Sequence, residues 1–213
     1  MKLTINILTL FTLTLALTSC EGQNKKSTSK SEKFNEKIVY LTSTDKSGQL
    51  MKEEEFWNII DKSRQTSSNN YQTQINSLKT ILLTFDATEI EKFDNTFTAL
   101  MSGTYNYTLW GASFVINGGC SDDCFEYFRQ YLIGHGKQKF YQTFKDPDSC
   151  VDWIKSEEED NWEGLQYSAL EAYRQKTGKD IPKTFKAKYE LKGKPFDEEK
   201  VGTQYPKLAK KFM

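Results

Sequence analysis

The feature that most constrains the fold of this chain is the segment at residues 110–134, which reads WGASFVINGGCSDDCFEYFRQYLIG. The stretch from 109 to 116 is almost entirely apolar, which is typical of a helix that is buried on most sides. Asn-Gly-Gly follows at 117–119, and Asn and Gly enter the left-handed conformation at little steric cost. We therefore expect a buried helix to end at this tripeptide.

A second helix is predicted to begin almost directly after the tripeptide. Ser121 is a favourable N-cap residue, and Asp122 and Asp123 place negative charge at the positive end of the helix dipole. Apolar side chains then recur at helical spacing, beginning with Phe125. Helix formation alone thus explains most of the motif, and any function of its polar residues has to be weighed against that role.

Helical periodicity also extends over the remainder of the domain. Spacings of four, three, four and three place one apolar stripe at Tyr71, Ile75, Leu78, Leu82 and Phe85. Further helices are predicted over 51–65, 86–103 and 137–145. Another helix is predicted to end at about residue 176. We expect a mainly α fold in a single compact multi-helix domain, residues 38–213, with at most a minor short strand at 38–42.

Charge is distributed unevenly towards the end of the chain. Residues 145–163 contain eight acids against two lysines, and the basic C-terminal extension, residues 183–213, contains nine lysines against four acids. Opposite charges attract, so we expect the extension to lie against the acidic segment, although a charged run is more often a solvated face.

The central motif resembles that of the bacterial family described as domain of unknown function 4240. The resemblance rests on the run from Trp110 to Ile133, on EFWNIID at 55–61 and on the Asp-Pro-Asp-Ser turn at 146–149, and it covers about residues 51–177. Two positions depart from the family pattern, Cys124 and His135. The resemblance implies a fold but no activity.

The N-terminus has the pattern of a lipoprotein signal peptide. Lys2 precedes an apolar, threonine-rich run, which ends in Leu-Thr-Ser before Cys20. Residues 1–19 are predicted to be the signal peptide, Cys20 the lipidation site and residues 20–37 a flexible polar tether. A plain membrane anchor is the alternative, but the run is short for a spanning helix.

These features predict a lipoprotein of the bacterial cell envelope, held at the membrane through lipidated Cys20 and facing the periplasm or the cell surface. Lysines and arginines together number 29, as do the acids, so no overall positive field favours nucleic acid, and we expect no nucleic-acid partner. A protein, peptide or glycan in the envelope is the expected class of partner. We expect no cofactor.

Three cysteines remain after processing, Cys120, Cys124 and Cys150, and they cannot all pair within one molecule. The favoured interpretation is that all three are small buried apolar side chains. A pair between Cys120 and Cys124 stays open, because the backbone brings them within range if Cys120 precedes the helix. No second cysteine pair or histidine cluster points to a metal site.

The polar cluster of the motif is the candidate functional surface. Its predicted binding residues are Trp110, Asn117, Ser121, Asp122, Asp123, Glu126 and Arg129. Helix caps and a surface ion pair would explain the cluster without any function, because spacings of four and three place Asp122, Glu126 and Arg129 on one helix face.

Two functions compete for this surface, and a structural role at the envelope is the third class that the sequence leaves open. The leading hypothesis is a non-enzymatic binding module. The alternative is a metal-dependent hydrolase in which Asp122, Asp123 and Glu126 hold a hard cation through their carboxylate oxygens. A serine hydrolase would have to use His135, the only histidine, and we reject it because no nucleophile elbow is present.

Overall fold

The computed structural model describes residues 47–68, 70–154 and 162–213. The predicted signal peptide, Cys20, the polar tether and the short strand at 38–42 lie outside these residues. The prediction of a mainly α fold is confirmed. The described part of the chain forms helices, and its only β-type pairing is a single bridge between Asn106 and Lys192.

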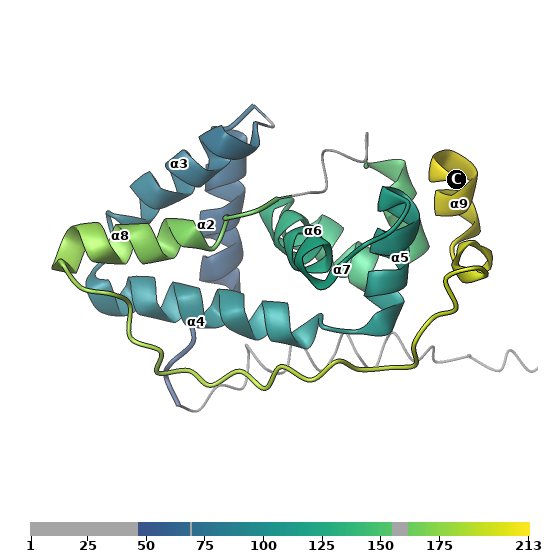
Figure 1. Ribbon diagram of the computed structural model, residues 1–213. Helices are drawn as coiled ribbons and strands as arrows, with labels where there is room; N and C mark the ends of the chain where they lie inside the picture. Colours follow the sequence, from purple (N-terminus) through teal and green to yellow (C-terminus); the bar gives the residue numbers. More distant parts are fainter. Residues whose placement is uncertain (1–46, 69, 155–161) are drawn as a thin grey trace, which may run out of the picture.

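The order of elements along the chain is as follows: α2 (Glu53–Gln65), α3 (Tyr71–Leu82), α4 (Ala87–Gly103), α5 (Tyr107–Asn117), α6 (Asp122–Gly134), α7 (Lys137–Lys145), the 3-10 helix η1 (Pro147–Asp152), α8 (Tyr167–Thr177), the 3-10 helix η3 (Val201–Thr203) and α9 (Pro206–Phe212). Figure 1 shows α2, α3 and α8 gathered at one end of the molecule and α5, α7 and α9 at the other. Helices α4 and α6 lie between and connect the two ends, since α4 packs on α8 and α6 packs on α5 and α7.

Local sequence signals set the ends of these helices. The Asp86 carboxylate accepts the Glu89 backbone N–H at 2.8 Å, which caps the start of α4. Gly118 ends α5 in the left-handed conformation, with φ 62°. Gly178 ends α8 in the same way, with φ 71°. The predicted starts and stops at these positions are confirmed.

One hydrophobic core runs through the domain. The apolar stripes predicted on α2, α3 and α4 face it, and aromatic rings from α2 and α4 meet there, with the Phe56 and Phe93 ring centroids 4.8 Å apart. Phe128 and Leu132 of α6 are buried in the same core. The second half of α6, residues 128–134, is buried on all sides, so the exposed side of this helix is confined to its N-terminal part, at Asp122, Asp123 and Glu126.

The last part of the chain, residues 179–213, crosses the outside of this helical body, and we call it the C-terminal strap. In Figure 1 it runs along α4 from the end of α8 to α5. The Lys192 N–H donates to the Tyr105 carbonyl at 3.1 Å, and the Tyr107 N–H donates to the Lys192 carbonyl at 2.9 Å. Helices η3 and α9 then pack on α5.

Asp148 of η1 fixes the end of the strap. Its carboxylate accepts the backbone N–H groups of Lys207 and Leu208, at 3.1 and 2.9 Å. The Lys211 ammonium donates to the carbonyls of Val151 and Ile154. The basic extension therefore does lie against the acidic segment, but the contacts described between them are to backbone groups and not between lysine and carboxylate side chains.

No helix within the described residues is long and apolar enough to cross a membrane.

Candidate functional site

The joint between α5 and α6 forms as the motif predicts. Gly118 and Gly119 both have positive φ, 62° and 137°, and no atom lies within 4 Å of the position that a Cβ would take at either glycine. The Ser121 hydroxyl then accepts the Cys124 backbone N–H at 3.3 Å and caps α6. Backbone conformation, and not close packing, is thus what requires glycine here.

A disulfide bond between Cys120 and Cys124 closes this joint, with the two Cα atoms 5.3 Å apart. The favoured interpretation of three separate buried thiols is therefore wrong for this pair. Cys120 lies before the N-cap and outside the helix, and this extended approach brings its sulfur back to Cys124 in the first turn. Cys150 is buried, as predicted, and takes no part in this disulfide.

Two of the predicted binding residues, Trp110 and Asn117, act mainly inside the protein. The Trp110 ring is nearly parallel to those of Phe125 and Tyr107, with interplanar angles of 9° and 10°, and its indole N–H donates to the Cys120 carbonyl at 2.9 Å. The Asn117 amide donates to the Ser113 carbonyl at 3.0 Å. Trp110 is partly buried and therefore supports the α5–α6 joint.

Arg129 does not lie on the surface either, although it has the helical spacing of an ion-pair partner. Its side chain is only 3% exposed. The guanidinium donates to the Met101 carbonyl at 2.6 Å and to the Phe125 carbonyl at 3.2 Å, and it lies over the ring of Tyr105, 4.9 Å from the centroid. Burial lowers the pKa of Arg129. The negative end of α4 and the aromatic rings stabilise this buried cation.

Ser121, Asp122, Asp123 and Glu126 form the exposed part of the predicted site. No hydrogen bond or ion pair within the described residues holds the side chains of the three acids. Nor is any group of three or more His, Cys, Asp or Glu side chains placed to hold a metal ion in the part of the chain that the structure describes. The hydrolase alternative stays a prediction for metal titration to test.

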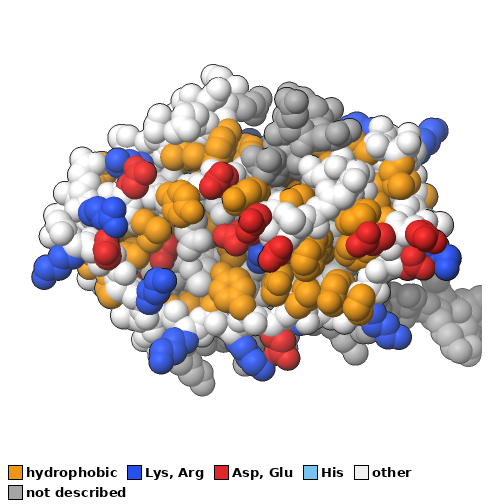
Figure 2. All heavy atoms as spheres, viewed as in Figure 1, with side chains coloured by type: hydrophobic (Ala, Val, Ile, Leu, Met, Phe, Trp, Pro, Cys, Tyr) orange, Lys and Arg blue, Asp and Glu red, His pale blue; other side chains and the backbone are white. Residues whose placement is uncertain are grey.

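Side chains from distant segments extend this exposed acidic surface. We call the combined surface the tyrosine–carboxylate face, and it consists of Asp123, Glu126, Tyr127, Glu163, Tyr167 and Tyr189. Tyr167 is 55% exposed and Tyr189 is 53% exposed; the only other large hydrophobic side chain exposed within the described residues is Met213. Figure 2 shows acidic side chains in the middle of one side of the molecule among hydrophobic ones, while most Lys and Arg side chains lie towards its rim.

The segments that carry this face are held together by a buried amide network. The Gln166 backbone N–H donates to the Gln130 side chain at 3.3 Å, which ties the start of α8 to α6. The Gln166 amide also donates to the Asp94 carboxylate at 3.1 Å and to the Thr98 hydroxyl at 3.0 Å, and so ties α8 to α4. Gly164, with φ 96°, makes the turn that precedes α8.

Electrostatic interactions link several of these side chains. Burial raises the pKa of Tyr127, and the charges of Glu163, Asp123 and Glu126 raise it further. Burial raises the pKa of Tyr189 too; the positive charge of Arg129 acts against this rise, and Glu126 adds to it. Both phenols are therefore neutral hydrogen-bond donors at neutral pH.

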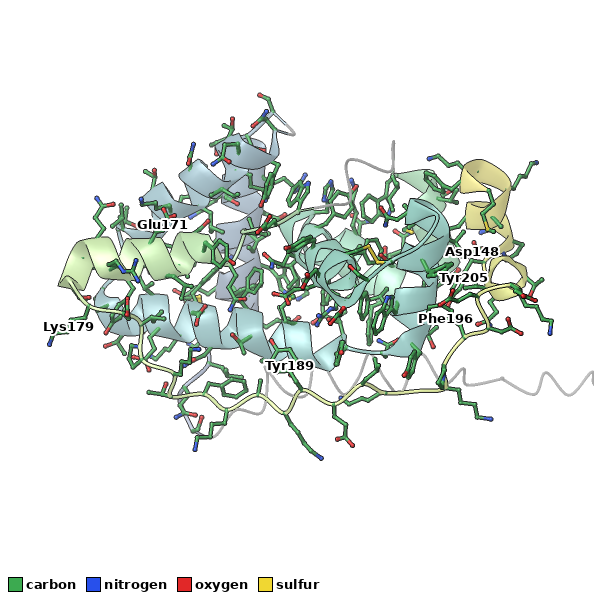
Figure 3. The ribbon with its side chains drawn as sticks, in the orientation of Figure 1. Asp148, Glu171, Lys179, Tyr189, Phe196 and Tyr205 are labelled. Atoms are coloured by element: carbon green, nitrogen blue, oxygen red, sulfur yellow. A yellow bond between two sulfur atoms is a disulfide. The ribbon has the colours of Figure 1, made fainter. Side chains whose placement is uncertain are left out.

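The C-terminal strap supplies Tyr189 to the face and then continues over α5. Figure 3 shows Tyr189 where the strap passes the end of α4, and Phe196 and Tyr205 further along it towards α9. The Tyr205 hydroxyl donates to the Thr108 carbonyl at 2.5 Å, and its ring packs where Gly111 lacks a side chain. The strap is therefore fixed after Tyr189, and it is also held before Tyr189, where the Asn95 amide donates to the Thr184 hydroxyl at 3.3 Å.

Sequence patterns could not place Tyr127, Tyr167 and Tyr189 together. Tyr127 was visible as an outward position on α6, but Tyr167 and Tyr189 reach it only through the tertiary packing of α8 and the strap. The one local signal available was Tyr167, which follows the acid-rich segment 145–163 closely in the sequence.

Comparison with known families shows which family the helical body of the chain belongs to. The family model described as Protein of unknown function (DUF4240) matches residues 51–175. This match covers more than half of the chain, so the chain belongs to that family, in agreement with the resemblance of its central motif. No curated protein and no solved structure matches the chain significantly. The C-terminal strap lies beyond the matched residues.

Proposed function

We propose that this chain is a lipid-anchored binding module of the bacterial cell envelope, and that it binds its partner through the exposed side of α6. The observation that carries the proposal is the position of Asp122, Asp123 and Glu126. Their carboxylates are exposed on a helix whose other face is fixed in the core, and no described side chain or backbone group satisfies them. Exposed groups on a rigid scaffold are available to a partner without reorganisation.

The construction of the joint supports a binding role. The Cys120–Cys124 disulfide, the Ser121 cap and the Trp110 hydrogen bond all hold the start of α6 in one position. Preorganisation of this kind reduces the entropy that is lost when a partner binds. The expected partner is a protein, peptide or glycan of the envelope.

Lipid anchoring is proposed from the signal peptide pattern and Cys20. Changing Cys20→Ser should abolish labelling with a fatty-acid probe, such as a palmitate analogue, and should release the protein from the membrane fraction. Unchanged membrane partition of this variant would overturn the lipoprotein assignment.

The binding surface is tested by the double variant Asp122→Asn with Asp123→Asn. It preserves side-chain shape and removes only charge, so the loss of helix-dipole stabilisation should stay below about 1 kcal/mol. We expect this variant to fold normally and to capture much less of the wild-type partner from envelope extract. Capture at the wild-type level would place the binding site elsewhere.

Thermal melting of the wild type and of this double variant distinguishes the hydrolase alternative from the binding module. A metal-dependent enzyme should gain thermal stability when Mg²⁺, Mn²⁺ or Zn²⁺ is added, because an ion that binds only the folded state stabilises it. A plain binding module should show no such shift. Stabilisation that disappears in the Asp122→Asn, Asp123→Asn variant would favour the hydrolase.

A further inference from the structure

We infer that the tyrosine–carboxylate face docks an arginine- and lysine-rich segment of a partner protein. This inference rests on the proposed binding function and names the chemistry of the partner. Its basis is the combination of exposed aromatic rings with carboxylates that form no ion pair within the described residues.

The exposed rings are the first part of the argument. Tyr167 and Tyr189 are two of the three large hydrophobic side chains that are exposed among the described residues, and both belong to this face. Tyr127, which is partly exposed, lies close to Tyr167. Tyrosine is enriched at the energetic centres of protein interfaces, because a large ring combines apolar contact with a hydroxyl donor.

The charge of the face selects the partner. The charges of Asp123, Glu126 and Glu163 act on Tyr127, while the cation beneath, Arg129, is buried and bound to carbonyl groups, and Lys188, beside Tyr189, is paired with Glu190. A surface with this charge repels anionic lipid headgroups and nucleic acid and attracts a cationic segment.

Guanidinium and ammonium groups match both components of the face. They form charge-assisted hydrogen bonds with carboxylates and stack on the faces of tyrosine rings. Arginine is the better match, because its planar group makes both contacts at once. A neutral glycan would gain from contact with the rings but not from the carboxylate charge, so its binding should not depend on salt concentration.

The position of the face is fixed before a partner arrives. The Gln166 network holds α8 against α6 and α4, and the strap that carries Tyr189 is fixed by backbone hydrogen bonds at Lys192. The rings and carboxylates therefore present one defined arrangement to a basic segment.

The test uses a fluorescein-labelled nona-arginine peptide and the full chain, with binding followed by fluorescence anisotropy at low salt. The face variant carries Asp123→Asn, Glu126→Gln and Glu163→Gln. The matched control carries Glu54→Gln, Glu198→Gln and Glu199→Gln, which are exposed acids outside the face, and Glu54 lies in the first turn of α2 as Asp123 does in α6. Thermal melting first establishes that both variants are folded.

We expect the face variant to raise the Kd of the peptide by at least about tenfold. The control, with the same change in net charge, should alter it by less than about twofold, because screening limits the effect of distant charges. Tyr167→Ala should also weaken binding, since docking requires the ring. Equal losses in face variant and control, or no effect of Tyr167→Ala, would show only diffuse attraction and overturn the inference.

A deca-glutamate peptide of the same label is the probe for the opposite charge and should not bind. If the Asp122→Asn, Asp123→Asn variant loses its envelope partner while nona-arginine fails to bind the wild type, the module has a partner of another chemistry. The proposed function then stands and this inference fails. If the double variant keeps its envelope partner and the face variant keeps its affinity for nona-arginine, both the proposed function and this inference are wrong.

Discussion

At the scale of single residues, Arg129 shows how much depends on which side of a helix faces the core. Its spacing from Glu126 and Asp122 is that of a surface ion pair, yet its guanidinium is buried and bound to the Met101 carbonyl at the end of α4. The sequence predicted the helix correctly. It could not predict that the α4 C-terminus and the Tyr105 ring would provide a buried site for the charge.

Gly118 is the residue whose conformation is easiest to test. Its φ of 62° lies in the left-handed region, where a β-branched residue is strained and asparagine is tolerated. Gly118→Val should therefore lower the free energy of unfolding in urea by at least about 1 kcal/mol, and Gly118→Asn by much less. Because no atom crowds the missing Cβ, equal losses in both variants would show that packing, and not backbone strain, requires the glycine.

Asp94 gives a prediction for pH. Burial raises the pKa of its carboxyl in the folded protein, and the hydrogen bond from Gln166 only partly opposes this. Below the unfolded value of about 3.9 the group is protonated in both states and costs nothing; as pH rises through the folded pKa, its ionisation destabilises the fold. Asp94→Asn still accepts from Gln166 and should be more stable than wild type at neutral pH.

The measurement is urea unfolding of both proteins between acidic and neutral pH. The stability difference between Asp94→Asn and wild type should shrink as pH falls and vanish near the unfolded pKa. A difference that grows on acidification would mean that the ionised carboxylate stabilises the fold.

At the scale of elements, the Cys120–Cys124 disulfide constrains the start of α6. It closes a very short loop, for which chain entropy gives a stabilisation of about 2 kcal/mol. The Cys120→Ser, Cys124→Ser variant should lose about that much in urea unfolding while its far-ultraviolet circular dichroism stays helical. The same loss should follow when wild type is reduced, and reduction should not affect the variant. A variant as stable as wild type would show that the cap and the glycines alone position α6.

Helix ends followed from the sequence because their causes are local. The Asp86 cap, the Gly118 and Gly178 stops and the short α7 all lie where composition and spacing predict them. The disulfide depended on whether Cys120 belonged to the helix, and one residue of uncertainty at a helix start was enough to hide it.

The candidate site was predictable only in part, because some of its residues come together only through tertiary packing. Ser121, Asp122, Asp123 and Glu126 are exposed at the start of α6, as expected. Tyr167 and Tyr189 could not be added, because their nearness to Tyr127 arises from the packing of α8 and the strap. Trp110 was predicted as a binding residue, but it is partly buried and its ring packs against those of Tyr107 and Phe125.

At the scale of the whole molecule, the C-terminal strap packs on the outside of the family domain, and Asp148 holds its end in place. Asp148→Ala removes the acceptor of two backbone N–H groups at the start of α9, so it should destabilise by about 2 kcal/mol. Amide hydrogen exchange should increase in the strap before it increases in α4. Because the acceptor binds backbone and not lysine side chains, high salt should leave the loss almost unchanged.

If simple attraction between the acidic segment and the basic extension held the strap, the outcome would differ. Salt alone would then release the strap in wild type, and Asp148→Ala would add little.

The central claim is that the exposed side of α6 is a binding surface in the cell envelope, and site-specific photo-crosslinking in the living bacterium tests it most directly. A photoreactive amino acid replaces Tyr127 within the face in one version of the full, lipidated chain, and Glu198 outside the face in the other. The account predicts a discrete crosslinked product from position 127 that is absent from position 198 and that weakens when Asp122→Asn and Asp123→Asn are added. A product from position 198 alone, or none from position 127, would contradict it.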